Sequence, residues 1–513
     1  MVRVQTETNI EILRQTAQLL EAENARLHRR LVELTRALAL AHGSPATQLE
    51  LEIRHLQEEL AQRTRALFER SSEKRPRPSA DGQQAIAEPA AARVGHGPRE
   101  QQSLPLVEAV HKLDVPDQVC PKCGGDLQVW QGQSEDADEI DVVERCFRIV
   151  RHKRQKYRCQ CMSCVETAMG PPKLIPGGRY SVDFAIAVAV GKYADHMPLA
   201  RQVTQMARQG LRVDSQTLWD QIFALHRHLL PSYEALHPQV LSHPVVGADE
   251  TTWRLMEKGQ TSKWWVWAVT CPQAVCYRIL PSRSAKAAAT ILGQYRGIVM
   301  ADGYGAYAAL QKEMAQHHNT VAFELANCWA HLRRKLVEAE AHYPVVHEAL
   351  GLIGKLYTIE AAIRQASSST PAERAARLLE ARHTQSAPIV EAIRQWLTTQ
   401  GLAALPQSAL GKAIGYAFGL WPGLTKFLTN PAIPLDNNYT EREMRAVAVG
   451  RKNHYGSRSL RGTQVAATFY SLIESAKLTG VNPVTYLREG TLRAIANPGT
   501  VTLPGDLLQP DTG

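Results

Sequence analysis

The stretch between residues 244 and 328 limits most strongly the folds open to this chain. Short apolar runs at 244–248, 264–269 and 297–301 alternate with turn residues, as expected of buried β-strands. The sequence on both sides of the stretch has a helical composition rich in Ala, Leu, Glu and Arg. We therefore predict a sheet enclosed by helices, which places the chain in the α/β class.

Acidic residues follow two of the predicted strands. Asp249 closes the run at 244–248, and Asp302 closes the run at 297–301. Two strand-end carboxylates that converge on a pair of ions about 4 Å apart suit a two-metal phosphoryl-transfer site. Mg²⁺, which Mn²⁺ can replace, takes only one or two carboxylates directly. Glu441, in the first turn of a predicted helix, is the candidate third acid.

Each of these acids also has a structural interpretation. An Asp before Gly is an ordinary turn former, and Asn438 followed by Glu441 resembles a capping box. Glu250 and Glu443 are neighbouring acids that compete for the metal role. Tyr304 is an alternative covalent nucleophile, although an aromatic residue after a strand is more often a packing residue.

Basic residues favour a polyanionic partner, since the net charge is +9 and the pI is about 9.0. They concentrate in a strand-like run before Cys159 and around Glu441, at densities that suit DNA phosphates. The candidate DNA-binding residues are Arg148, Arg151, Lys153, Arg154, Lys156, Arg158, Arg442, Arg445, Arg451 and Lys452.

Six of the nine cysteines lie between Cys120 and Cys164, which indicates metal binding in a reducing compartment. Cys120 and Cys123 form a knuckle on a Gly-rich turn that suits tetrahedral Zn²⁺. Cys161 and Cys164 have the spacing of a second knuckle, with Cys159 as the alternative ligand. The alternative is a zinc ribbon with a purely structural role that does not contact DNA.

The N-terminal segment has the heptad pattern of a leucine zipper. Leu13, Leu20, Leu27 and Leu34 occupy one heptad position, and Asn24 lies at the other, where a buried amide favours a parallel dimer. An amphipathic helix packed on its own chain is the alternative. The Pro-, Ala- and Gly-rich sequence that follows lacks periodicity and is expected to be a linker.

A possible helix-turn-helix lies within the helical stretch at 176–240. The run at 199–210 reads as a helix followed by a Gly-containing turn, and Ser215 is the expected cap of the second helix. Two packed helices joined by a short turn are equally common in any helical domain.

Several motifs in order make the chain similar to transposases of the insertion sequence 66 family. They are Leu67-Phe-Glu-Arg-Ser-Ser-Glu-Lys74, the Cys120 knuckle, Lys192-Tyr-Ala-Asp-His-Met-Pro-Leu199, Ala248-Asp-Glu-Thr251, Asp302-Gly-Tyr304, Cys328-Trp-Ala-His331-Leu-Arg-Arg-Lys335, Asp436-Asn-Asn-Tyr-Thr-Glu-Arg442 and Gly450-Arg-Lys-Asn453. The resemblance implies an RNase H-like catalytic core with an Asp-Asp-Glu triad at Asp249, Asp302 and Glu441, and a helical insertion before the last acid. The second cysteine pair is shifted from the family pattern.

The pattern and the resemblance together predict a multidomain α/β protein. Its expected parts are a coiled coil (1–72), a linker (73–117), a zinc ribbon-like domain (118–175), a helical DNA-binding domain (176–240), an RNase H-like core in two segments (241–335 and 429–490), a helical insertion (336–428) and a C-terminal tail (491–513).

The expected function is cleavage and transfer of DNA strands at the terminal inverted repeats of a bacterial insertion sequence. The expected cofactors are Mg²⁺ or Mn²⁺ and Zn²⁺. The partners are transposon and target DNA, a second copy through the zipper, and accessory proteins of the same element, as the resemblance implies. No membrane segment is expected, and the compartment is the bacterial cytoplasm, at the nucleoid. The alternatives are a non-catalytic zinc-dependent DNA-binding protein and an RNase H-like nuclease without terminal-repeat specificity.

Overall fold

The computed structural model describes residues 147–158 and 165–508, apart from 258–259, 294, 318–322 and 366–369, and a few positions before residue 127. By its contacts the chain divides into two units, one of residues 68–145 and one of residues 1–67 with 146–513. Among the described residues, no helix combines the length and the apolar character needed to span a membrane.

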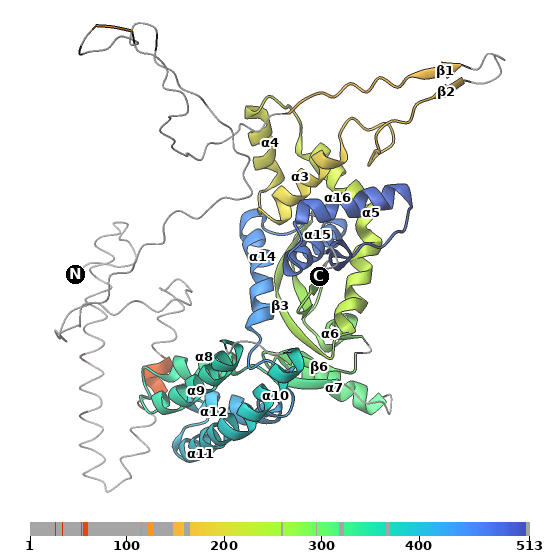
Figure 1. Ribbon diagram of the computed structural model, residues 1–513. Coiled ribbons are helices and arrows are strands. Elements are labelled where there is room, and N and C mark those ends of the chain that lie inside the picture. Colours follow the sequence, from red (N-terminus) through yellow and green to blue (C-terminus); the bar gives the residue numbers. More distant parts are fainter. Residues whose placement is uncertain are drawn as a thin grey trace, which may run out of the picture. The chain divides into compact units, whose positions relative to one another are not determined.

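A five-stranded mixed sheet forms the centre of the second unit (Figure 1). Its order is β5-β4-β3-β6-β7; β3, β4 and β5 are antiparallel neighbours, whereas β6 and β7 run parallel to β3. This mixed α/β arrangement is consistent with an RNase H-like core. The strands are β3 (Val245–Glu257), β4 (Gln260–Cys271), β5 (Ala274–Leu280), β6 (Ile298–Ala301) and β7 (Glu324–Asn327).

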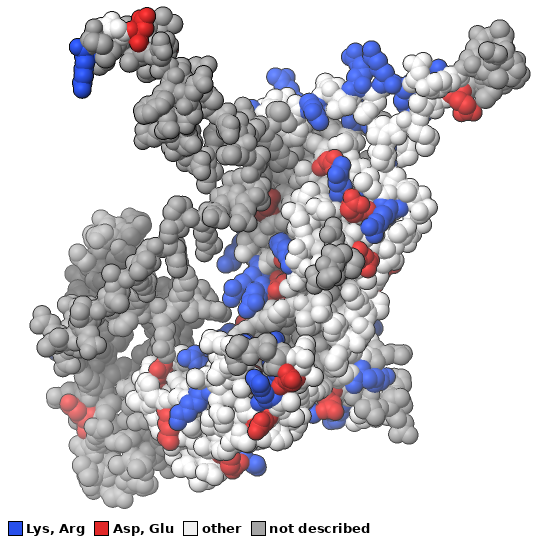
Figure 2. Space-filling model, viewed as in Figure 1, with Lys and Arg blue, Asp and Glu red and all other residues white. Residues whose placement is uncertain are grey.

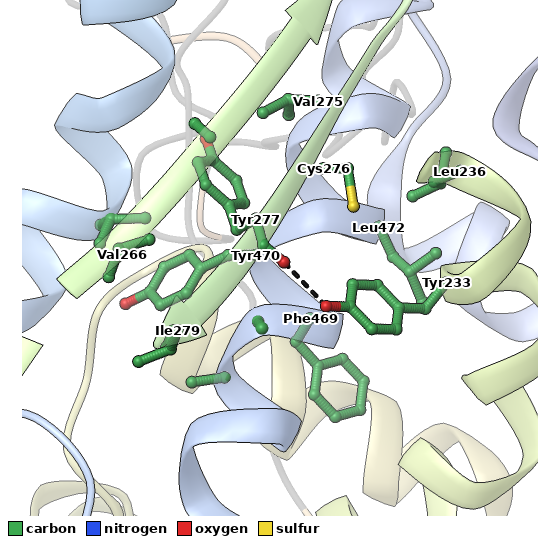
Figure 3. Close-up of a cluster of buried hydrophobic side chains, with 14 of the residues drawn as sticks. Tyr233, Leu236, Val266, Val275, Cys276, Tyr277, Ile279, Phe469, Tyr470 and Leu472 are labelled. Atoms are coloured by element: carbon green, nitrogen blue, oxygen red, sulfur yellow. Dashed lines mark hydrogen bonds between the residues drawn. The ribbon is translucent and has the colours of Figure 1, made fainter. Parts of the chain in front are cut away.

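Two helices, α5 (Ser215–Leu241) and α15 (Leu460–Leu478), pack against β5 and build the main core with it. Figure 3 shows Tyr233 of α5, Tyr277 of β5 and Phe469 and Tyr470 of α15 converging in this core. The buried Tyr233 hydroxyl is not left unpaired, since it donates to the Tyr277 carbonyl at 2.8 Å. Burial of these large rings contributes most of the stabilisation here.

Helix α15 also protects the sheet edge formed by β5. The backbone N–H of Val275 donates to Ser475 Oγ at 3.0 Å, and that of Tyr277 donates to Ser471 Oγ at 2.8 Å. An exposed edge strand would offer these groups to another chain. The serines therefore satisfy the edge from within the molecule.

The helical stretch before the sheet contains α3 (Val182–Tyr193), α4 (Leu199–Arg208) and α5. A turn that includes Gly210, with φ of 82°, joins α4 to α5. The expected cap at Ser215 is wrong by one residue: Asp214 is the N-cap, and its carboxylate accepts from the Thr217 N–H at 2.6 Å. An ionised carboxylate also suits the positive end of a helix.

Between β7 and the last core segment lies a second hydrophobic cluster, built by helices. This cluster also encloses a charged side chain, Arg382, which is 1% exposed. Its guanidinium donates to both carboxylate oxygens of Glu360 and to the carbonyls of Phe427, Asn430 and Ile433. The helices are α8 (Trp329–Ala339), α9 (Val346–Gln365), α10 (Pro371–Ala381), the π-helix η2 (Arg382–Ser386), α11 (Ala387–Ala403), α12 (Ala409–Gly419), α13 (Trp421–Thr425) and η3 (Lys426–Leu428). Helix α8 extends past residue 335, where the sequence analysis ends the first core segment and begins the helical insertion.

The remaining elements complete the core and extend from it. Helix α16 extends past residue 490, where the sequence analysis ends the second core segment and begins the C-terminal tail. The basic run before Cys159 is strand only at its end, where β1 pairs antiparallel with β2; residues 147–155 have no regular structure. These elements are β1 (Lys156–Arg158), β2 (Val165–Thr167), α6 (Ala285–Leu292), α7 (Gly305–His317), α14 (Asn438–His454), α16 (Pro483–Ala496) and η4 (Pro504–Leu507).

Three predictions fall on parts of the chain outside the described residues. The zipper leucines and Asn24 lie there, as do the linker at 73–117 and the proposed zinc ligands Cys120, Cys123, Cys159, Cys161 and Cys164. They stay predictions.

Candidate active site

The first two carboxylates of the predicted triad leave neighbouring parallel strands at the same level. Gly247 of β3 lies opposite Met300 of β6, and Asp249 and Asp302 each follow two residues later. The prediction that Asp249 ends its strand is wrong, because β3 continues to Glu257 as a long antiparallel ribbon with β4. Only the parallel pairing with β6 ends at Gly247. Both side chains therefore lie where that pairing stops.

Helix α14 brings the third acid, Glu441, to this end of the sheet. Its packing on β3 is close, since a Cβ on Gly247 would lie 1.9 Å from Thr440 Oγ1. Thr440 Oγ1 in turn lies 2.8 Å from Thr270 Oγ1 on β4. Glycine at position 247 is what permits this approach, and the approach carries the next residue along α14, Glu441, toward Asp249.

The start of α14 is held by Asn437, which is 2% exposed. Its backbone N–H donates to Cys328 Sγ at 3.1 Å, and its side-chain amide donates to the Ala248 carbonyl at 3.0 Å. Asn437 is also the N-cap position, and it makes no side-chain cap bond. The capping box expected between Asn438 and Glu441 is therefore absent, and the Glu441 carboxylate does not cap the helix.

Two side chains of α8 face the Glu441 carboxylate. His331 Nε2 lies 3.4 Å from Glu441 Oε1, and Arg334 lies 3.5 Å from Glu441 Oε2. Cys328, at the start of α8, is buried and accepts the bond from Asn437. The Cys-x-x-His motif thus connects α8 to the beginning of α14.

The electrostatics show that the acids are neighbours. Burial, followed by the charges of Glu250, Asp302 and Glu441, raises the pKa of Asp249 to about 8, against a lowering by the hydrogen bond from the Glu250 backbone. A bound divalent cation would favour the ionised form of such a carboxyl.

The donor set fits a hard divalent cation. It consists of carboxylate oxygens, and Glu441 Oε1 is buried without a hydrogen-bond partner among the described residues. In that same part of the chain, no three His, Cys, Asp or Glu side chains stand close enough to hold an ion as they are placed. Mg²⁺ keeps several waters and takes only one or two carboxylates in direct contact.

Glu250 and Glu443, the two acids that compete for the metal role in the sequence, are both buried. Glu250 is 7% exposed; it forms an ion pair with Arg283 and accepts from the Tyr307 hydroxyl at 2.7 Å. Glu443 is also buried, and burial followed by the charge of Glu474 raises its pKa. Neither is presented to a ligand as Asp249 is.

Tyr304 is a packing residue, as one of its two interpretations predicts. The Arg283 guanidinium lies 3.7 Å from the centre of its ring, and its hydroxyl donates to the Arg283 carbonyl. That hydroxyl is therefore occupied by a hydrogen bond to the protein backbone.

The predicted DNA-binding residues near Glu441 divide into two groups. Arg442, Arg445 and Lys452 are exposed along α14, and Figure 2 shows basic side chains gathered over the face where Figure 1 places that helix. Arg451 instead turns toward β3 and donates to the hydroxyls of Thr251 and Thr252. In the basic run, Arg148, Arg151, Lys153, Arg154 and Lys156 are exposed; the side chain of Arg158 lies outside the described residues.

Sequence reasoning missed the residues that position the acids: Gly247, Asn437, Thr440 and Arg334. Asn437 and Thr440 lie inside the motif at 436–442, and Arg334 lies inside the motif at 328–335, so the motifs held the signal. Local sequence patterns could not show the role of these residues, because each acts through a partner more than 100 residues away.

Comparison with known proteins identifies the family. A sequence model described as "Transposase IS66 family" matches residues 177–465, a range that contains all three acids. Two uncharacterized proteins of Sinorhizobium fredii (strain NBRC 101917 / NGR234) are also similar: y4jD is 31% identical over 427 residues, covering 80% of each chain, and y4qI is 31% identical over 411 residues, covering 77% of this chain and 73% of its own. The chain belongs to the IS66 family of transposases, and its membership implies a role in DNA transposition.

Proposed function

We propose that the protein cleaves and joins DNA strands at the terminal inverted repeats of a bacterial insertion sequence, with Asp249, Asp302 and Glu441 as its catalytic carboxylates. The observation that carries the proposal is geometric: Asp249 and Asp302 each follow by two residues the paired Gly247 and Met300, where the pairing of β3 with β6 ends, and α14, which carries Glu441, packs on Gly247. It involves three separate segments of a chain that belongs to a transposase family.

In this mechanism the protein forms no covalent bond to DNA. In cleavage, a water oxygen forms a bond to phosphorus as the bond from phosphorus to the 3′-oxygen of the element's end breaks, and that oxygen takes up a proton. In joining, the freed 3′-hydroxyl loses its proton and forms a bond to a target phosphorus as the bond from that phosphorus to the 3′-oxygen of the target strand breaks. Bound Mg²⁺ or Mn²⁺ supplies activation of the attacking oxygen and stabilisation of the leaving oxygen. Asp249, Asp302 and Glu441 would hold it, and His331 and Arg334 orient Glu441.

The surrounding residues bind the substrate. Arg442, Arg445 and Lys452 project from the helix that carries Glu441, so they neutralise phosphates beside the scissile bond. The basic run at 148–156 provides a second set of phosphate contacts. We expect the protein to act on the chromosome, in the bacterial cytoplasm.

The remaining parts of the proposal concern assembly. The zipper makes a homodimer or a larger complex, and Zn²⁺ organises the cysteines. The described strands on either side of Cys159–Cys164 pair antiparallel, with Arg158 opposite Val165. A hairpin connection of this kind suits a zinc knuckle.

The test uses labelled duplex DNA carrying the ends of the element, with Mg²⁺ or Mn²⁺, and scores binding and cleavage separately. We expect wild-type protein to cut at the ends, and Asp249→Asn, Asp302→Asn and Glu441→Gln to bind normally without cutting. Glu443→Gln is the matched control, since this buried acid two residues from Glu441 is expected to tolerate neutralisation. Binding without cutting by the wild type, even with the accessory proteins added, would favour a DNA-binding remnant and overturn the proposal.

A further inference from the structure

A hollow of about 540 Å³ opens at the far end of α14 from Glu441. It is lined by the turn between α3 and α4, by the exposed face of α4 and by Asn453 near the end of α14. Two sequence motifs, at 192–199 and 450–453, meet here, and Lys452 is the one residue of these motifs that the proposed mechanism uses. The hollow is therefore a candidate for a second function of these motifs.

The hollow is rich in positive charge. Arg201 and Arg208 lie seven residues apart on one face of α4, both are exposed, and neither forms a recorded ion pair in the described part of the chain. Asp195 is the acid in the described lining. With two arginines against one carboxylate, the lining carries a net positive charge that favours an anion.

The turn is shaped by an unusual backbone conformation. His196 has φ of 57°, a left-handed conformation that residues other than glycine seldom adopt. Asp195, His196 and Met197 of this turn all line the hollow, so the strained backbone shapes its wall.

The basic face of α14 connects the hollow to the candidate active site. Arg442, Arg445 and Lys452 are exposed on this helix, and Asn453 at its end lines the hollow. A helix rises about 1.5 Å per residue, so the twelve steps from Glu441 to Asn453 span about 18 Å. One strand of duplex DNA advances about 3.4 Å per base pair, so this span corresponds to about five base pairs.

We propose that the hollow between the α3–α4 turn, α4 and the end of α14 binds a backbone phosphate of DNA about five nucleotides from the bond that is cleaved. Arg201 and Arg208 hold the phosphate, and Asp195 moderates the affinity. The inference rests on the proposed function for the position of the cleaved bond. It gives the helical domain a defined contact with the same DNA strand that enters the active site.

The first experiment measures the affinity for end-bearing duplex by fluorescence anisotropy over a range of NaCl concentrations. Each phosphate contact contributes about 0.9 to the slope of log affinity against log salt. We expect the Arg201→Gln/Arg208→Gln double variant to lower this slope by about 1 and Asp195→Asn to raise the affinity. Arg394→Gln, an exposed arginine on α11, is the charge-matched control and should leave the slope unchanged. An unchanged slope in the double variant overturns the inference.

The second experiment locates the phosphate. Single uncharged methylphosphonates are placed in turn along the strand, and we expect one position to weaken binding by wild-type protein but not by the double variant. Sensitivity that is equal in both proteins at every position overturns the inference. Inorganic phosphate is titrated as a competitor; if it abolishes the difference between the two proteins at millimolar concentration, the hollow is a site for free phosphate and not for DNA.

The same duplex separates the two proposals. If wild-type protein cuts the ends and the double variant keeps the wild-type slope, the hollow is not a DNA site and the transposase function stands. If the slope falls in the double variant but no protein cuts, the hollow binds DNA and the proposed catalytic function fails.

Discussion

His226 on α5 illustrates how a single buried residue links stability to pH. It is 5% exposed, and burial lowers its pKa from 6.5 to about 4. Between these two values the unfolded chain binds a proton that the folded protein excludes, so stability falls as the pH drops through this window. We expect this residue alone to remove about 2.5 kcal/mol of unfolding free energy between pH 7 and pH 4.5.

Urea denaturation at the two pH values checks this. His226→Gln should lose less stability on acidification than the wild type, because its side chain does not titrate. His383→Gln removes an exposed histidine of η2 and is the control. Equal acid sensitivity in His226→Gln and the wild type would contradict the expectation.

At the scale of elements, the contact between α8 and α14 decides where Glu441 lies. His331 and Arg334 are both within 3.5 Å of its carboxylate, from an element more than 100 residues earlier in the sequence. We expect His331→Asn to slow metal-dependent cleavage about tenfold or more, as is typical when a side chain that orients a metal ligand is lost. Affinity for the DNA ends should not change, because the basic residues of α14 stay in place.

Single-turnover cleavage and equilibrium binding, measured side by side, separate the two effects. Arg333→Gln, an exposed neighbour on α8, serves as the matched variant. A parallel loss of binding and cleavage in His331→Asn would mean that α8 supports DNA binding and not the orientation of Glu441. A lower melting temperature at an unchanged rate would assign it a purely structural role.

At the scale of the whole molecule, the zinc prediction concerns how the N-terminal half is organised. We expect about one zinc ion per chain by elemental analysis of the purified protein, as four thiolates would bind. Cys120→Ser and Cys161→Ser should each lose the ion. Cys271→Ser, which changes a buried cysteine of β4, should retain it. Full zinc content in the two knuckle variants would refute the assigned ligands.

Much of the core could be predicted because its signals are local. Apolar runs between turn residues predicted strands within β3, β4 and β6, and helical composition predicted α3 to α5 and the helices after β7. Asp302 was expected after a strand and follows β6; Glu441 was expected in a first helical turn and lies in that of α14. Period and composition act over a few residues, so one sequence suffices to detect them.

Only the tertiary structure decided which of these residues meet. Asp249 lies within a long strand and not at its end, because β3 pairs on one side with β6 and on the other with the longer β4. Arg451 was predicted to contact DNA, yet its guanidinium donates to Thr251 and Thr252 across 200 residues of chain. Likewise, Asn437 and not Asn438 is the N-cap residue of α14, since its bonds to Cys328 and Ala248 hold it there.

The sequence by itself thus determined the kinds of element and the identity of the acids, through short-range propensity and motif. The tertiary structure decided that the charges of Asp302 and Glu441 act on Asp249, and that motifs at 192–199 and 450–453 share one basic hollow. The physical reason is that convergence depends on parallel strand pairing and on the close approach of α14 at Gly247. Those contacts join residues far apart in the chain, which no local pattern encodes.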